Sequence, residues 1–401
     1  MMRISSNTIF DSNVAAMNQQ QARLLQTQQQ IASGRRLLTA SDDPVAATRA
    51  LEIGQADAMN TQYASNRDSV RNTLSLAEGT LQSVTSLLQD VHDAAVIAGN
   101  SMLKSSDRSA IATDLSGRLK ELIGLANSTD GIGNYLFSGF QSRTQPFADT
   151  ATTGVVYFGD DGQRNVQVSA ARQMASSDSG ADVFMRVKNG NGTFVTQAAA
   201  ANAGTGVINS GSVTNPTALV AGNSYSISIS DVAGVMKYTV TGAPTPLALP
   251  VAGDYVSGQA ISFDGMQIDI KGVPVVGDTF TVTPSTNESI FKTISNLITA
   301  LNTPVVGANL TNSLEHAQNQ SDNALNNVLA TRATLGLRLN EVDALQISGD
   351  DMGLQFKQTL SKLQDTDYNK AASDLAQQML SLQAAQQSFA LVKGLSLFNY
   401  I

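Results

Sequence analysis

Apolar side chains recur at helical spacing near both ends of the chain, and this pattern limits the fold more than any other feature. From residue 10 to residue 38 an apolar residue returns every seven positions: Phe10, Met17, Leu24, Ile31 and Leu38. The neighbouring seam holds Val14, but then Gln21, Gln28 and Arg35. A heptad with one apolar seam predicts a helix whose narrow stripe must be covered by other helices.

The C-terminal end has a similar pattern. A last helix is predicted from about residue 368 to residue 393, with an apolar seam that includes Leu375, Met379, Leu382 and Phe389. Gly394 then separates this helix from a short apolar tail that contains Leu397 and Phe398. An exposed apolar tail favours association, so we expect the residues of both seams and of the tail to pack between subunits.

A helix start follows the N-terminal repeat at Ser41, Asp42, Asp43 and Pro44. Asp43 is suited to cap a helix, and Pro44 is suited to its first position. We interpret the four residues as a hinge where a second helix starts. The alternative is an acid/base or metal site, but no histidine, cysteine or third carboxylate lies nearby in the sequence.

The second helix is predicted from Pro44 to about Met102, and its apolar residues alternate in steps of three and four. They are Leu74, Ala77, Leu81, Val84, Leu88, Val91, Ala95, Ala98 and Met102. A third helix is predicted from about residue 107 to residue 126. Helix resumes near Ser289.

The segment from about residue 139 to residue 284 changes to short β-branched and aromatic runs between turn residues. Asp264-Gly265 between Phe263 and Met266 predicts a tight hairpin, and residues 183–187 are among the predicted strands. Residues 196–216 are predicted to form a surface loop. The predicted fold is mainly α with an inserted antiparallel β domain. Its parts are terminal axial helices (1–40 and 366–401), a long-helix bundle (41–138 and 287–365) and the insert (139–286).

Composition excludes several classes of function. The chain has no cysteine, which removes disulfides, thiol catalysis and cysteine-bound metals. Its net charge of -8 and lack of a basic patch argue against nucleic-acid binding. No apolar run is long enough to span a membrane. The two histidines, His92 and His316, have no metal-like or triad-like spacing, so we expect no catalytic, cofactor or metal site.

Several motifs resemble the flagellin superfamily of bacterial axial proteins. The superfamily's N-terminal helix and hinge are similar to residues 3–7 and to residues 30–36 running into Ser41–Pro44. Its C-terminal inner helix is similar to residues 332–340. Residues 134–139 and 144–147 resemble the hook-associated protein 3 branch in particular. So does the end of the chain, from Asp367 to Tyr400.

The resemblance implies a structural role without enzymatic activity. Subunits of this branch form the junction layer between hook and filament, outside the cell, after type III export without a cleaved signal peptide. The implied partners are further copies of the chain in a helical lattice, hook-associated protein 1, flagellin, and an export chaperone that binds the C-terminal helix. The terminal helices would line the central channel, and the β domain would face outward.

Two other functions remain open on sequence grounds. A filament flagellin belongs to the same class and differs mainly in abundance. A surface-exposed adhesin belongs to another class. A flagellin with an enzyme activity in the inserted domain is disfavoured, because we find no catalytic constellation there. Immunogold labelling of intact flagella separates these functions, because a junction protein labels one band at the hook–filament boundary.

Overall fold

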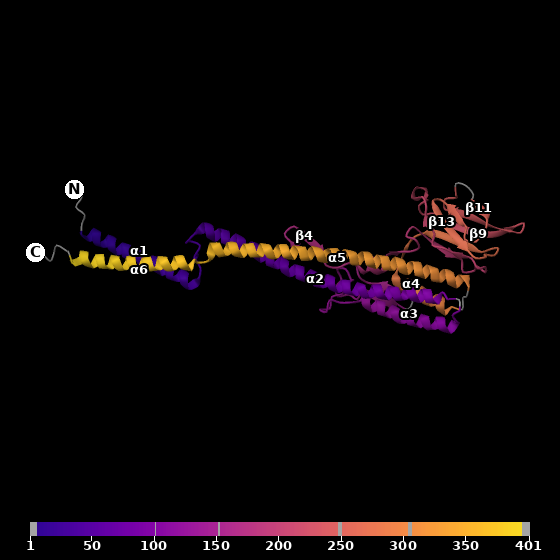
Figure 1. The fold of residues 1–401 in the computed structure, drawn as a ribbon, viewed down its shortest axis with the longest axis horizontal. Coiled ribbons are helices and arrows are strands. Elements are labelled where there is room, and N and C mark those ends of the chain that lie inside the picture. Colours follow the sequence, from indigo (N-terminus) through magenta and orange to yellow (C-terminus); the bar gives the residue numbers. More distant parts are fainter. Residues whose placement is uncertain (1–5, 101, 151–152, 248–250, 304–306, 395–401) are drawn as a thin grey trace. The chain divides into compact units, whose positions relative to one another are not determined.

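The computed structural model describes residues 6–100, 102–150, 153–247, 251–303 and 307–394 (Figure 1). The chain divides into two compact units. Unit 1 contains residues 1–65 and 344–401, and unit 2 contains residues 66–343. Two long helices, α2 (Pro44–Ala98) and α5 (Ala308–Gln364), contribute to both units. The predicted boundaries of terminal helices, bundle and insert stay a prediction.

Where the structure describes it, unit 1 consists of helices and the two short segments that connect them, residues 34–43 and 365–367. Helix α1 (Ser6–Ser33) packs along α6 (Tyr368–Gly394), and the first part of α2 packs along the last part of α5. The N–H of Ala46 donates to Asp43 Oδ1 over 3.1 Å, so Asp43 caps α2. Helix α1 ends at Ser33 because Gly34 turns left-handed with φ of 70°. The prediction that this helix reaches Leu38 is therefore wrong.

The helices of unit 2 surround an apolar core. They are the remainder of α2, α3 (Ser105–Ala126), α4 (Ile290–Asn302) and the first part of α5. Eight of the nine predicted seam residues of α2, from Leu74 to Ala98, are buried. Met102 is the exception, because α2 ends at Ala98 and leaves this side chain 85% exposed.

A cluster of aromatic rings joins these helices to the segment that follows α3. Phe137, Phe147, Phe184 and Phe291 are all buried, and neighbouring centroids lie 5.2–5.9 Å apart. The strand predicted at residues 183–187 is wrong. Residues Ala181–Met185 form a π-helical turn (η1), which points Phe184 into the cluster, and Asn327 of α5 donates to the carbonyls of Asp182 and Val183.

Three pairs of short antiparallel strands lie outside the β domain. Strand β1 (Phe147–Thr150) pairs with β2 (Gly154–Tyr157), and β3 (Asn165–Ser169) pairs with β4 (Arg172–Ala175). Strand β5 (Val187–Lys188) pairs with β15 (Asn287–Glu288). Asn189 then donates its backbone N–H to the Thr286 carbonyl and accepts the Thr286 N–H on Oδ1. We call the β5–β15 pair and the Asn189–Thr286 contact the stem, because the chain enters and leaves the β domain there.

The β domain consists of two antiparallel sheets around one core. The larger has the order β11 (Val251–Asp254), β10 (Val235–Ala243), β9 (Ser224–Val232), β14 (Thr279–Pro284) and β6 (Phe194–Ala198). The smaller contains β12 (Ala260–Phe263), β13 (Met266–Lys271), β7 (Val207–Ile208) and β8 (Ser212–Val213). Ile227, Ile268 and Phe280 are among the side chains that fill the core.

The predicted hairpin at Asp264-Gly265 is present, since Phe263 pairs with Met266 and both turn residues have positive φ. The predicted loop over residues 196–216 is wrong in part, because β7, β8 and most of β6 lie within it. The central antiparallel region between helical ends confirms the predicted fold class.

Candidate functional site

The candidate site is the pair of terminal helices, because the predicted packing residues lie there. On α1, Met17, Leu24 and Ile31 are half-buried, and Phe10 is 48% exposed. On α6, Leu375, Leu382 and Phe389 are half-buried. The two seams meet within one chain, with the rings of Phe10 and Phe389 at a centroid distance of 5.2 Å. Each seam thus has a partner in the same chain, but that partner covers it incompletely.

The structure does not place every predicted residue in this seam. Met379 is 55% exposed, and Ala371 is the buried residue of α6 instead. Leu38 is half-buried in the segment between α1 and α2. Leu397 and Phe398 lie outside the described residues. Whether these side chains pack between subunits stays a prediction.

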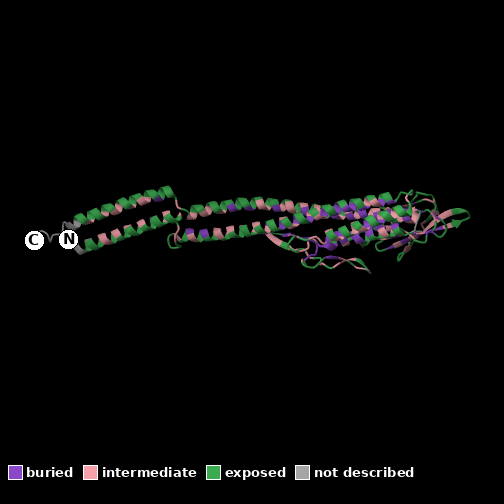
Figure 2. Cartoon of the chain, turned by 90° about the horizontal axis from the view of Figure 1, so that it is seen from below, coloured by how far each residue is buried: buried purple, intermediate pink, exposed green. Residues whose placement is uncertain are grey.

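The outer faces of the two helices also carry large apolar side chains. Leu25 on α1 is 56% exposed, and Leu380 and Leu391 on α6 are 68% and 69% exposed. Among the described side chains, Thr27 is the one buried residue of α1 and Ala371 the one buried residue of α6 (Figure 2). By contrast, the helices of unit 2 show continuous buried stretches in the same figure. The terminal pair therefore retains apolar surface on which other helices can pack.

Hydrogen bonds join the segments that connect the terminal helices to α2 and α5. The N–H of Arg36 donates to the Gln364 carbonyl over 2.7 Å, and the N–H of Thr366 donates to the Gly34 carbonyl over 2.9 Å. The Arg36 guanidinium donates to the Leu363 carbonyl over 2.7 Å. We call the contacts of residues 34–36 with residues 363–366 the clasp. The clasp joins the α1–α2 connection to the α5–α6 connection. The terminal helices therefore cannot separate at the ends next to these connections without breaking the clasp.

Ser41, Asp42, Asp43 and Pro44 lie beside the clasp. Asp42 Oδ2 accepts the N–H groups of Leu38 and Thr39, and Asp42 Oδ1 accepts from Gln26 of α1. The hydrogen bond from the Thr39 backbone is the main reason why the pKa of Asp42 is lowered. Asp43 Oδ2 lies 3.6 Å from Arg36 Nη1, besides capping α2. The acidic residues thus bind the chain itself, while their role as a hinge stays a prediction.

Neither histidine lies in a cluster of metal ligands. His92 Nδ1 lies 3.2 Å from Asp322 Oδ1, and His316 Nε2 lies 3.9 Å from Glu288 Oε2. Within the described ranges, no group of three or more metal-ligating side chains comes together. In the same part of the chain, no helix is both long and apolar enough to cross a membrane.

Sequence reasoning missed the clasp. The carbonyl of Gly34 accepts a hydrogen bond from Thr366, a residue more than 300 positions away in the sequence. The sequence around Arg36 does not indicate its partners, which include the backbone carbonyls of Leu363 and Gln364. A glycine directly after a heptad repeat, followed by a cation, is the one local signal available.

Comparison with known proteins identifies the family. A family model described as the bacterial flagellin N-terminal helical region matches residues 4–142. The chain is 30% identical over 403 residues to flagellar hook-associated protein 3 of Salmonella typhimurium, with 99% of each chain covered.

Solved structures agree with this relationship. The flagellar junction protein FlgL from Legionella pneumophila is 32% identical with a TM-score of 0.72, over 79% of this chain and all of that one. Xanthomonas campestris FlgL is 31% identical with a TM-score of 0.71, over 77% of this chain and 99% of that one. The predicted resemblance is confirmed: this chain belongs to the flagellar hook-associated protein 3 family and is a structural, non-enzymatic, extracellular component of the hook–filament junction of the bacterial flagellum.

Proposed function

We propose that copies of this chain form one layer of a helical lattice through their terminal helices, and that this layer is the adaptor on which flagellin assembles. The observation that carries the proposal is the incomplete burial of the α1–α6 pair. Its seam residues Met17, Leu24 and Leu382 are only half-buried, while Leu25, Leu380 and Leu391 are exposed on its outer faces.

The energetic argument favours packing between copies. Burying a leucine or methionine side chain completely stabilises a structure by ~1.5–3 kcal/mol relative to leaving it exposed. Several such side chains along two helices of 28 and 27 residues provide enough apolar surface to order the helices in a lattice. The α1–α6 pair alone leaves these side chains partly exposed, so it does not obtain the free energy of burying them completely. Further helices are therefore the expected neighbours of the pair.

We assign the partners by position in the flagellum. Hook-associated protein 1 is the neighbour on the hook side, and flagellin is the neighbour on the filament side. The terminal helices line the central channel, and the inserted β domain faces outward, because the apolar seams lie on the helices. This arrangement gives a layer that repeats the lattice of both neighbours along the axis.

Export fits the same properties. The chain has no cysteine, so no disulfide hinders passage of an unfolded polypeptide through the type III apparatus. The exposed leucines of α6 need a cover before assembly, and an export chaperone bound to this helix supplies one. Copurification of such a chaperone with the full chain, and its loss when α6 is removed, tests this assignment.

Immunogold labelling of intact flagella tests the junction role directly. A single labelled band at the hook–filament boundary is the expected result. Label along the whole filament would instead identify a filament flagellin. A strain that lacks this chain should build hooks, retain no filament, and release flagellin into the medium. Normal filaments on such a strain, with loss of surface attachment alone, would favour the adhesin function and refute the adaptor role.

A further inference from the structure

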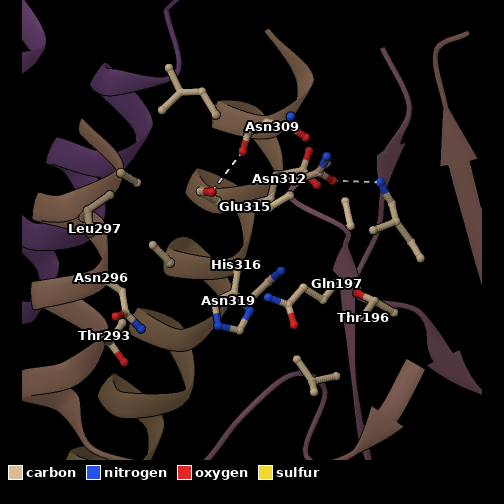
Figure 3. A pocket seen from close by; sticks show the side chains of 18 of the residues that line it. Thr196, Gln197, Thr293, Asn296, Leu297, Asn309, Asn312, Glu315, His316 and Asn319 are labelled. Carbon is tan, nitrogen blue, oxygen red and sulfur yellow. Dashed lines mark hydrogen bonds between the residues drawn. The ribbon is translucent and has the colours of Figure 1, made fainter. Parts of the chain in front are cut away.

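A groove of about 500 Å³ lies in unit 2 between the β domain and two helices. One wall is strand β6, and the other is formed by α5 with α4 behind it (Figure 3). Gln197 of β6 and His316 and Asn319 of α5 point into the space between strand and helix. The volume lies in the range of sites that bind a small molecule or a short segment of chain.

Strand β6 is an edge strand, since it pairs with β14 on one side and ends the order of its sheet. The Ala199 N–H donates to the Thr279 carbonyl, and the Ser285 N–H donates to the Thr193 carbonyl. The backbone N–H and C=O groups of the odd-numbered residues of β6 therefore point toward β14. Those of the even-numbered residues point away from it, toward the open edge.

The outward backbone groups of β6 are only partly used. Asn191 closes a turn on Phe194, donating its N–H to the Phe194 carbonyl and accepting the Phe194 N–H on Oδ1. For Thr196 and Ala198, no described residue bonds the outward backbone N–H or C=O. Two successive outward residues offer the alternating donors and acceptors that a further strand requires.

The helical wall is polar and already held in position. Asn312 of α5 accepts the Ile208 N–H on Oδ1 and donates to the Gly206 carbonyl, with distances of 3.1 Å. Asn309 donates to the Asn202 carbonyl over 3.0 Å. These bonds fix α5 against the segment that leads into β7, so the groove keeps its width without a ligand.

Other polar side chains in the groove are free to bind. Within the described part of the chain, the side chains of Gln197 and Asn319 have no hydrogen-bond partner. The titratable lining groups are Glu315 and His316, and His316 lies near Glu288. Burial raises the pKa of Glu315, which favours its neutral form. Amide side chains outnumber titratable ones in this lining, which suits an uncharged, hydrogen-bonding occupant.

We propose that this groove binds an extended, uncharged peptide segment with small polar side chains, which adds to β6 as a further strand. Its backbone pairs with Thr196 and Ala198, while its side chains contact Gln197 and Asn319. A saccharide of similar size also forms hydrogen bonds with amides, but it does not use the alternating backbone groups of a strand edge. The free edge therefore favours a peptide.

The test uses the full chain and a capped peptide of alternating threonine and asparagine, with binding followed by calorimetry and amide hydrogen exchange. Peptide binding should slow exchange at the Thr196 and Ala198 amides. Ala198→Pro removes one outward N–H, which an edge strand tolerates, and should weaken binding by about five- to tenfold. Ala198→Ser keeps that N–H and should bind as the parent chain does.

The peptide also has a matched control. N-methylation at alternate amides leaves its side chains unchanged but prevents strand pairing, so the methylated peptide should not bind. The proposal would be overturned if the methylated peptide bound as tightly as the unmethylated one, or if Ala198→Pro bound the peptide as tightly as the parent chain. It would also be overturned if millimolar peptide did not slow exchange at the Thr196 and Ala198 amides. Saturable binding of an N-acetylglucosamine oligomer in its place would show that the groove is a saccharide site instead.

Discussion

Replacing Gly34 by alanine tests how far the clasp depends on the left-handed turn at its centre. Gly34 has φ of 70°, and its carbonyl accepts the Thr366 N–H over 2.9 Å. An L-residue in this conformation costs ~1–2 kcal/mol, and the reduced freedom of alanine in the unfolded chain offsets ~0.4–1 kcal/mol. We therefore expect a net loss of about 1 kcal/mol from the backbone alone.

Tyr368 adds a second contribution, which a double variant separates from the first. A methyl group on Gly34 would lie 2.9 Å from Tyr368 Oη. Tyr368 is 58% exposed, so the end of its ring can move and the steric cost should be small. Gly34→Ala should thus be nearly as damaging in a Tyr368→Phe background as in the parent chain.

Amide hydrogen exchange measures the effect at the clasp itself. The N–H groups of Arg36 and Thr366 donate across it, so a loss of about 1 kcal/mol should speed their exchange about fivefold. Gly34→Asn is the control, because asparagine tolerates a left-handed backbone better than alanine. If Gly34→Ala leaves both rates unchanged, or if Tyr368→Phe removes its whole effect, the turn does not limit the clasp and the reasoning is wrong.

Three further predictions concern the seam, the groove and the stem. Leu24→Asp places a charge in a half-buried seam and should abolish filament retention, with flagellin released into the medium. Gln21→Glu lies on the exposed face and should reduce filament retention only mildly, so equal retention by the two variants would contradict a seam role. Burial raises the pKa of Glu315, so folding favours its protonated form, and the free energy of unfolding should fall as pH rises through the folded-state pKa. Glu315→Gln should then resist urea better than the parent chain near neutral pH but not in acid, and an equal gain in urea resistance at both pH values would refute this. Deleting residues 191–285 with a short linker should leave the helices of unit 2 folded by circular dichroism, since the stem holds both cut ends together, whereas a cut that starts at residue 151 removes Phe184 and should unfold them.

Much of the helical framework could be predicted because its signals are local. The seam of α2 follows from spacing alone, and Asp43-Pro44 and Ser289 mark helix starts by side chains that cap within one turn. The hairpin at Asp264-Gly265 follows from two residues that accept positive φ. In each case the residues that decide the structure are close together in the sequence.

The rest depends on partners far away in the chain. Val183 and Phe184 have strand-like propensity, but Phe291 and Asn327 favour a helical turn there. Strands β7 and β8 have two residues each and exist because β13 pairs with them. The clasp and the groove combine segments separated by about a hundred residues or more, so no local pattern announces them.

The stem has a consequence for how this chain can change over evolutionary time. Because β5 and β15 pair where the β domain begins and ends, the chain leaves the helices and returns to them at almost the same point. A replacement domain whose own ends lie side by side could be joined there without altering the spacing of α4 and α5. We therefore expect related chains to vary most, in both length and sequence, between residues 190 and 285, and to keep the stem itself as a fixed point of exchange.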